Sequence, residues 1–165
     1  GACRPGPRAR ARARGRGARR AAPPFMVRFK NAYAVCRVEW KGGRAAEPPG
    51  EAALLAGLRG GVGAAFGAAG LARAQAALQV KFFDARSGVF VLRCDRTDFR
   101  RVWASATLLT ELCRTTCAVR VLRRSGSLRA CKAAAWVELA DRLTALGAGE
   151  DALRAARAQV DAISL

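Results

Sequence analysis

The chain has 165 residues, and its 30 Lys and Arg against 12 Asp and Glu give a net charge of +18, with no His at all. This length fits one domain of ordinary size plus an appendage. The lack of His excludes a Ser-His-Asp triad, a His-bound metal and an imidazole general base. A strongly basic chain favours a polyanion, most often a nucleic acid, as its partner. No stretch approaches the roughly 20 uninterrupted apolar residues of a membrane span, so we expect no membrane partner.

Residues 1–25 differ from the rest in composition, because they carry eight arginines, several Gly and Pro, and no acid. Such a segment cannot bury enough apolar surface to offset its ordering entropy, so we predict that it is disordered. Three interpretations remain open: an RNA-binding arm, an organelle-targeting segment, or translated upstream sequence that the mature protein lacks. Met26 is the only methionine, which favours the third, and the absence of Ser weakens the second.

The first half of the remaining chain predicts a strand, a helix and a hairpin. Residues 26–40 are rich in aromatic and β-branched residues and predict a strand, and the Gly- and Pro-rich residues 41–50 predict a loop. Leucines at helical spacing predict a helix over 51–65, although its glycines cost about 1 kcal/mol each, and 66–71 reads as a loop. Residues 77–84 and 88–94 predict two strands joined by a short turn, in which Gly88 can adopt a positive φ.

The second half predicts a helix, a strand and two further helices. Asp95 can cap a helix that runs to about Cys113, and residues 115–124 alternate as a strand. Ser127 can cap a helix over 128–146, which Gly147 and Gly149 end, and a last helix follows.

The order β-α-β-β-α-β followed by two helices predicts an α+β sandwich of the ferredoxin-like or RNA-recognition-like kind. We expect four antiparallel strands with two helices on one face, and C-terminal helices that cover part of the other face. The predicted domain spans 26–146, with a C-terminal helix in 147–165.

Neither the acids nor the cysteines indicate a catalytic or metal site. The close acidic pairs, Asp95/Asp98 and Glu150/Asp151, stand at predicted helix starts, where carboxylates favour the helix dipole. Of the six cysteines, Cys94, Cys113, Cys117 and Cys131 could in principle hold zinc, but their spacing is irregular and they fall on apolar patterns. Free, buried thiols in a reducing compartment are the favoured interpretation.

The basic residues are more informative than the acids. Between Leu112 and Val137 there are six bases and no acid, and the turn after Arg124 opens a helix whose free N–H groups suit phosphate. Bases on the predicted strands extend this positive charge over the sheet. The predicted RNA-binding residues are Arg28, Lys30, Lys81, Arg93, Arg120, Arg123, Arg124, Arg129 and Lys132. Residues 86–93 match the strand motif of RNA-recognition domains only in Gly88 and Phe90-Val91, and the aromatic residues that flank this core in the motif are missing. We therefore expect contacts to the RNA backbone and not the stacking of bases on the sheet.

Four segments taken together resemble a known family: MVRFKNAYAVC at 26–36, FGAAGLA at 66–72, residues 81–112, and GSLRACKAAAWVEL at 126–139. They are similar to the small protein subunit of ribonuclease P and ribonuclease MRP, the "processing of precursor, five" family, over about residues 26–146. The Ala- and Gly-rich first helix and the lack of an acidic tail depart from that pattern.

The resemblance implies a subunit of a ribonucleoprotein that removes the 5′ leader of precursor tRNA and processes precursor rRNA. It implies that the RNA subunit does the chemistry with Mg²⁺, and that the protein binds no cofactor itself. The implied partners are that RNA, precursor tRNA indirectly, and a TIM-barrel-type protein subunit, in the nucleus and nucleolus. By position, it implies RNA contacts at Arg28, Lys30, Arg129 and Lys132. A ferredoxin-like protein-interaction module with only generic RNA affinity remains the alternative.

Overall fold

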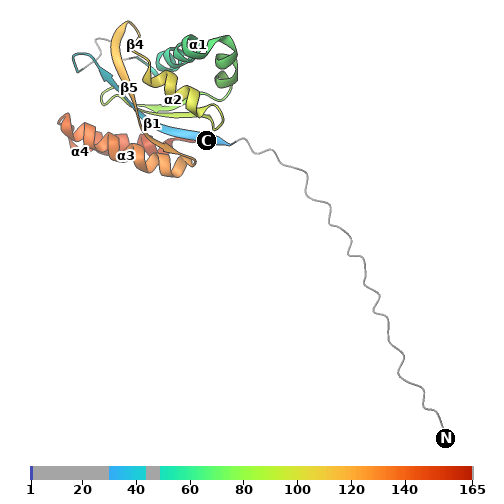
Figure 1. Ribbon diagram of the computed structural model, residues 1–165. Helices are drawn as coiled ribbons and strands as arrows, with labels where there is room; N and C mark the ends of the chain where they lie inside the picture. Colours follow the sequence, from blue (N-terminus) through green and yellow to red (C-terminus); the bar gives the residue numbers. More distant parts are fainter. Residues whose placement is uncertain (2–29, 44–48, 165) are drawn as a thin grey trace.

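The computed structural model describes residue 1, residues 30–43 and residues 49–164 of the chain. Its elements are β1 (Asn31–Trp40), α1 (Glu51–Gln75), β2 (Gln79–Phe83), β3 (Val89–Asp95), α2 (Phe99–Thr107), β4 (Glu111–Leu112), β5 (Thr115–Ser125), α3 (Leu128–Ala145) and α4 (Glu150–Ala162). Figure 1 shows three layers, with α1 and α2 on one face of the sheet and α3 and α4 on the other. The predicted β-α-β-β-α-β sandwich with two C-terminal helices is thereby confirmed.

The sheet has five strands in the order β2-β3-β1-β5-β4, all paired antiparallel. β1 lies at its centre, between β3 and β5, because its aromatic and β-branched residues suit a strand buried on both faces. The predicted hairpin is confirmed: Gly88 has a φ of +74°, and its N–H donates to Asp84 O at 2.9 Å.

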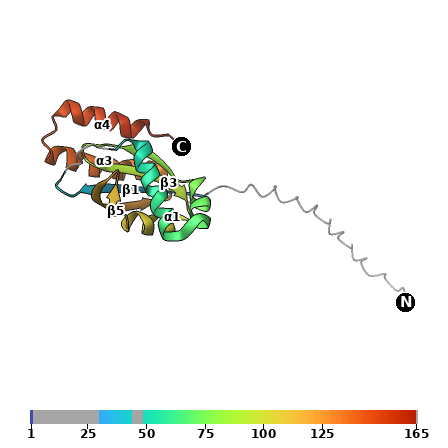
Figure 2. The ribbon, with the colours of Figure 1, turned by 90° about the horizontal axis from the view of Figure 1, so that it is seen from above.

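Two hydrophobic cores lie on opposite faces of the sheet, and β1 contributes to both. Ala34, Cys36 and other alternate residues of β1 pack under α1 and α2. Tyr33 and Val35 pack under α3 and α4. The second face is therefore covered by helices, whereas the corresponding face of an RNA-recognition domain is the one that stacks bases (Figure 2).

α1 is longer than expected, because it continues through residues 66–71, where a loop was predicted. The prediction was wrong except at Gly67, whose φ of +68° makes a kink inside the helix. Gly57 and Gly61 let α1 approach closely to its neighbours: a Cβ on Gly57 would lie 2.3 Å from Leu112 Cδ2. This close approach is made against the end of α2 and the segment that ends in β4.

α1 is also long and apolar enough to cross a membrane, judged by length and composition only. Its residues Leu54, Leu58 and Val62 are instead fully buried against the sheet. Only 17% of its most apolar 18-residue window is buried, and a single helix that passes a test of length and composition is weak evidence for a membrane span.

α2 is shorter than expected, and β4 was not predicted. The helix begins at Phe99 and ends at Thr107, and the chain then forms a tight hairpin between β4 and β5. Cys113 and Arg114, the two central residues of that hairpin turn, both have positive φ. Asp95 does not cap the helix, because its Oδ1 accepts hydrogen bonds from Thr97 N and Oγ1 instead. The apolar spacing of residues 108–112 continued the helical pattern and so concealed the strand.

The predictions for residues 2–25, and for the first four residues of the opening segment at 26–36, lie outside the described residues. The same is true of Cys3. The five cysteines that the structure describes are free, and four of them are buried.

We predict that iodoacetamide at pH 8 modifies Cys113 in the native protein, in preference to the other four described cysteines. Cys113 is exposed, whereas burial raises the pKa of Cys94 to about 12 and that of Cys131 to about 11. The thiolate is the reactive form, so these buried thiols are both shielded and neutral. Peptide mass spectrometry measures the modification, and Cys113→Ser serves as the control. Equal modification of Cys94 without denaturant would contradict the packing described above.

Candidate nucleic-acid interface

Basic side chains gather at one end of the sheet, where β1 begins and β3 and β5 end. Asn31 pairs with Asp95, and Tyr33 pairs with Ser125, so these strand ends lie side by side. Arg96 N donates to Lys30 O at 2.8 Å, and both α2 and α3 begin just after the two strand ends. We call this region the basic end, and its members are Lys30, Arg96, Arg100, Arg123, Arg124 and Arg129, all exposed.

Arg123 and Arg124 point to opposite faces of the sheet. Arg123 pairs with Val35, which packs under α3 and α4, while Arg124 pairs with Ala34, which packs under α1 and α2. The guanidinium of Arg124 lies over the ring of Phe99 at 4.6 Å from its centroid, which fixes its position next to the start of α2. The strand end therefore presents positive charge to both sides.

A groove of about 640 Å³ runs between the end of β5 and the outer side of α3. Arg123 and Arg124 line one side, Ser125 and Gly126 form the turn, and Ala130, Ala133, Ala134 and Val137 make an apolar wall. Its lining contains no acid. Ser127 Oγ accepts from Ala130 N at 3.3 Å, so the predicted cap is confirmed and one of the N–H groups at the start of α3 is already satisfied. The groove can hold the sugar-phosphate edge of a strand but offers no aromatic surface for a base.

Arg120 lies apart from the basic end. Arg120 pairs with Arg37 of β1, which is four residues after Tyr33, the residue that pairs with Ser125. Its Nε donates to Glu39 Oε2 at 2.9 Å. The pKa of Glu39 is lowered, chiefly because Arg37 donates a hydrogen bond to its carboxylate, and Arg120 lowers it further. The carboxylate therefore stays ionised and offsets the positive charge of the two arginines.

Of three other predicted residues, Arg93 and Lys132 are partly engaged within the protein. Arg93 is half-buried and donates from Nη1 to Gln79 Oε1 at 3.4 Å. Lys132 donates from Nζ to the backbone O of Asp161 at 2.8 Å, which ties α3 to α4. Lys81 sits at an irregularity in the edge strand β2. Of the predicted residues, the structure thus brings together Lys30, Arg123, Arg124 and Arg129. The half-buried Arg93 lies beside them, because it pairs with Tyr33, and Arg28 lies outside the described residues.

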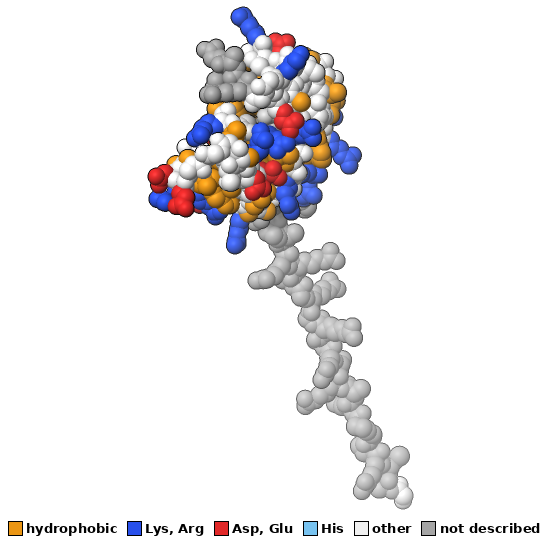
Figure 3. All heavy atoms as spheres, turned by 90° about the vertical axis from the view of Figure 1, so that its left-hand side faces the viewer, with side chains coloured by type: hydrophobic (Ala, Val, Ile, Leu, Met, Phe, Trp, Pro, Cys, Tyr) orange, Lys and Arg blue, Asp and Glu red, His pale blue; other side chains and the backbone are white. Residues whose placement is uncertain are grey.

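Sequence reasoning missed Arg96 and Arg100 as members of the site. Their neighbour Asp98 is buried and forms ion pairs with Arg101 and, at 3.7 Å, with Arg73. Within the described part of the chain, Arg96 and Arg100 have no carboxylate partner. The one feature of the sequence that could have indicated Arg96 and Arg100 was their position between the end of a predicted strand and the start of a predicted helix. On the face that Figure 3 shows, Lys and Arg side chains are scattered over the surface, with Asp and Glu beside several of them.

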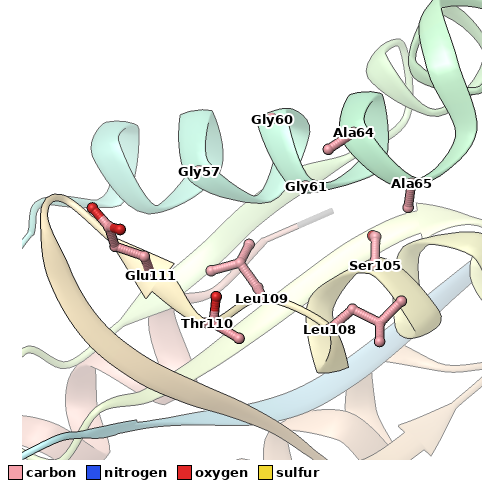
Figure 4. Close-up of a pocket in the computed structure, with 10 residues that line it drawn as sticks. All are labelled: Gly57, Gly60, Gly61, Ala64, Ala65, Ser105, Leu108, Leu109, Thr110 and Glu111. Atoms are coloured by element: carbon pink, nitrogen blue, oxygen red, sulfur yellow. The ribbon is translucent and has the colours of Figure 1, made fainter.

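A second groove, of about 520 Å³, lies between α1 and the end of α2 (Figure 4). Its walls are Gly and Ala from α1 and the segment Leu108, Leu109, Thr110 and Glu111. No cation lines this groove, so it does not extend the basic end. Among the residues described, no three His, Cys, Asp or Glu side chains gather as a metal site.

The sequence profile of the Rpp14/Pop5 family matches residues 32–136. "Ribonuclease P/MRP protein subunit POP5" of Schizosaccharomyces pombe is 34% identical over 70 residues, which cover 42% of this chain and 50% of that protein. The mouse protein of the same name is 28% identical over 111 residues, which cover 65% of this chain and 66% of that protein. A chain in the cryo-EM structure of yeast ribonuclease MRP aligns over 61% of this chain and 77% of its own length, with 16% identity and a TM-score of 0.47. The chain thus spans half to about two thirds of the length of the curated relatives it matches.

Proposed function

Because the chain belongs to the Rpp14/Pop5 family, we propose that it is a protein subunit of the ribonuclease P/MRP ribonucleoprotein and binds the RNA of that complex. The observation that carries this proposal is the basic end, where six exposed cations meet at the strand and helix termini. Phosphate contacts of this kind supply affinity without reading sequence.

The protein is proposed to be non-catalytic. The chain has no His, several of its described carboxylates are engaged in ion pairs or turns, and the cation-lined groove holds no acid. Bond cleavage then belongs to the RNA subunit with Mg²⁺ bound to the RNA, and the protein itself needs no cofactor. The substrates of the complex would be precursor tRNA and precursor rRNA, which this subunit meets indirectly.

The proposal further includes a TIM-barrel-type protein subunit as a neighbour in the complex and a location in the nucleus and nucleolus. The resemblance of the sequence supports both. Purification of the chain from cells, followed by sequencing of the bound RNA, tests them together. Recovery of a long non-coding RNA with precursor-tRNA cleavage activity is expected, while protein partners that survive nuclease treatment without such an RNA would favour the interaction-module alternative. The purified protein alone is expected to cleave no RNA.

The triple variant R123A/R124A/R129A is expected to bind structured RNA more weakly and with a flatter salt dependence. Each lost phosphate contact removes about 0.7–0.9 from the slope of log K against log salt, so the loss of three contacts should flatten the slope by about 2–3. Filter binding of the RNA between low and physiological salt measures both quantities.

The matched control is R86A/R114A/R154A, which removes the same charge from exposed arginines outside the basic end. This control variant should keep the wild-type slope of log K against log salt to within the contribution of about one phosphate contact. Equal flattening in both variants would mean that the RNA responds to net charge alone, and the assignment of the basic end would then be wrong.

A further inference from the structure

Trp103 is a large aromatic side chain that the fold leaves exposed next to the basic end. It lies on α2 and is 41% exposed, although its helix neighbours Phe99 and Val102 are buried. Its ring meets that of Phe99 edge to face, with the centroids 5.7 Å apart and an interplanar angle of 71°. Phe99 in turn lies beneath the guanidinium of Arg124. Phe99 therefore holds an exposed indole and an exposed guanidinium around one buried ring.

The surroundings of Trp103 are positively charged. Arg100 lies three residues earlier on α2, hence on the same side of the helix, and it is exposed. The carboxylate nearest in sequence, Asp98, is buried and already engaged by Arg101 and Arg73. An anionic ligand that reaches Trp103 thus meets arginines at the helix start and at the end of β5.

We propose that Trp103 stacks on an unpaired base of the bound RNA, while Arg100 and Arg124 contact the phosphates beside that base. This inference rests on the proposed RNA-binding function and adds the kind of RNA that the site takes, namely a single-stranded segment or a loop. Proteins commonly recognise unpaired bases by stacking them on an exposed aromatic ring with an adjacent arginine. The stacking surface that the sheet lacks is therefore supplied by the middle of α2.

A base explains the exposed Trp103 better than a protein partner does. An aromatic anchor between proteins sits among apolar residues that become dry on binding, because the centres of interfaces are depleted of charge. The exposed neighbours of Trp103 at the basic end are arginines instead. The apolar Leu108, which is 71% exposed, lines the other groove, between α1 and the end of α2.

The test compares two probes that carry the same number of phosphates: a single-stranded oligoadenylate and an oligomer of abasic nucleotides. Trp103→Ala should weaken binding of the oligoadenylate by about five- to a hundred-fold, as expected for one lost base stack. It should leave binding of the abasic oligomer, and the salt slope for both probes, unchanged. Trp103→Phe, which keeps a ring, should restore most of the affinity and guards against a folding defect in the Ala variant.

Leu108→Ala is the matched control, because it removes an exposed apolar side chain just after the same helix without removing a ring. It should bind both probes like the wild type. If Trp103→Ala weakens both probes equally or neither of them, or instead releases a protein from the nuclease-treated complex, stacking is overturned. If the unaltered full chain binds neither probe nor structured RNA, the failure lies with the proposed function itself.

Discussion

Gly88→Ala is expected to lower the free energy of unfolding by about 3 kcal/mol or more. Gly88 has a φ of +74°, where a side chain costs about 1–2 kcal/mol. A Cβ there would also lie 2.5 Å from the backbone O of Val38, and overpacking of this kind costs about 1–3 kcal/mol. Neither the added Cβ nor the backbone O of Val38 can move away freely, because Val38 N donates a hydrogen bond to Gly88 O at 2.9 Å and holds the two residues together. Urea denaturation of the purified chain measures the loss.

Gly147→Ala separates the two causes. Gly147 has a φ of +72°, but no atom lies within 4 Å of the position its Cβ would take. This control carries the conformational cost alone, so we expect a loss of about 1–2 kcal/mol. A loss at Gly88 no larger than that at Gly147 would show that the contact with Val38 does not constrain the hairpin.

Phe90→Ala is expected to lower the free energy of unfolding by about 3–5 kcal/mol. Phe90 is fully buried in β3, in the core beneath α1 and α2, so its removal leaves a cavity in a close-packed layer. Domains are stable by only about 5–15 kcal/mol, so this loss would leave little reserve.

Phe66→Ala is the control for that experiment, because Phe66 is an exposed phenylalanine near the kink of α1. It should cost less than about 1 kcal/mol. Thermal unfolding followed by circular dichroism compares the two variants, and similar losses would contradict the placement of Phe90 in the core.

The elements that the sequence predicted well are those whose local pattern and tertiary role agree. The hairpin of β2 and β3 has alternating residues and a glycine where the turn needs positive φ, and α3 has both its capping Ser127 and its final glycine. The errors came where the local pattern was ambiguous. Residues 66–75 contain glycines that predicted a loop, yet only Gly67 leaves helical φ/ψ and α1 resumes after this kink. β4 is a two-residue strand whose leucine continues a helical spacing.

The candidate site was predictable in composition but not in arrangement. The density of arginines near residues 120–132 was visible in the sequence, and Arg123, Arg124 and Arg129 do meet at one end of the sheet. Arg120 is only three residues from Arg123, yet it binds Glu39, because it pairs with Arg37 whereas Arg123 pairs with Val35, nearer the basic end. Arg100 and Trp103 joined the site through the antiparallel register of β1 with β3 and β5, and no local pattern contains that register.

The central strand β1 makes the two helical layers a single cooperative unit. Its alternate side chains supply both cores, so detachment of α3 and α4 would expose Tyr33 and Val35 and weaken the wall against which α1 and α2 pack. The C-terminal layer therefore cannot behave as a removable cover. A ligand bound at the basic end touches the termini of elements from both layers, so its binding energy would stabilise the whole domain against unfolding.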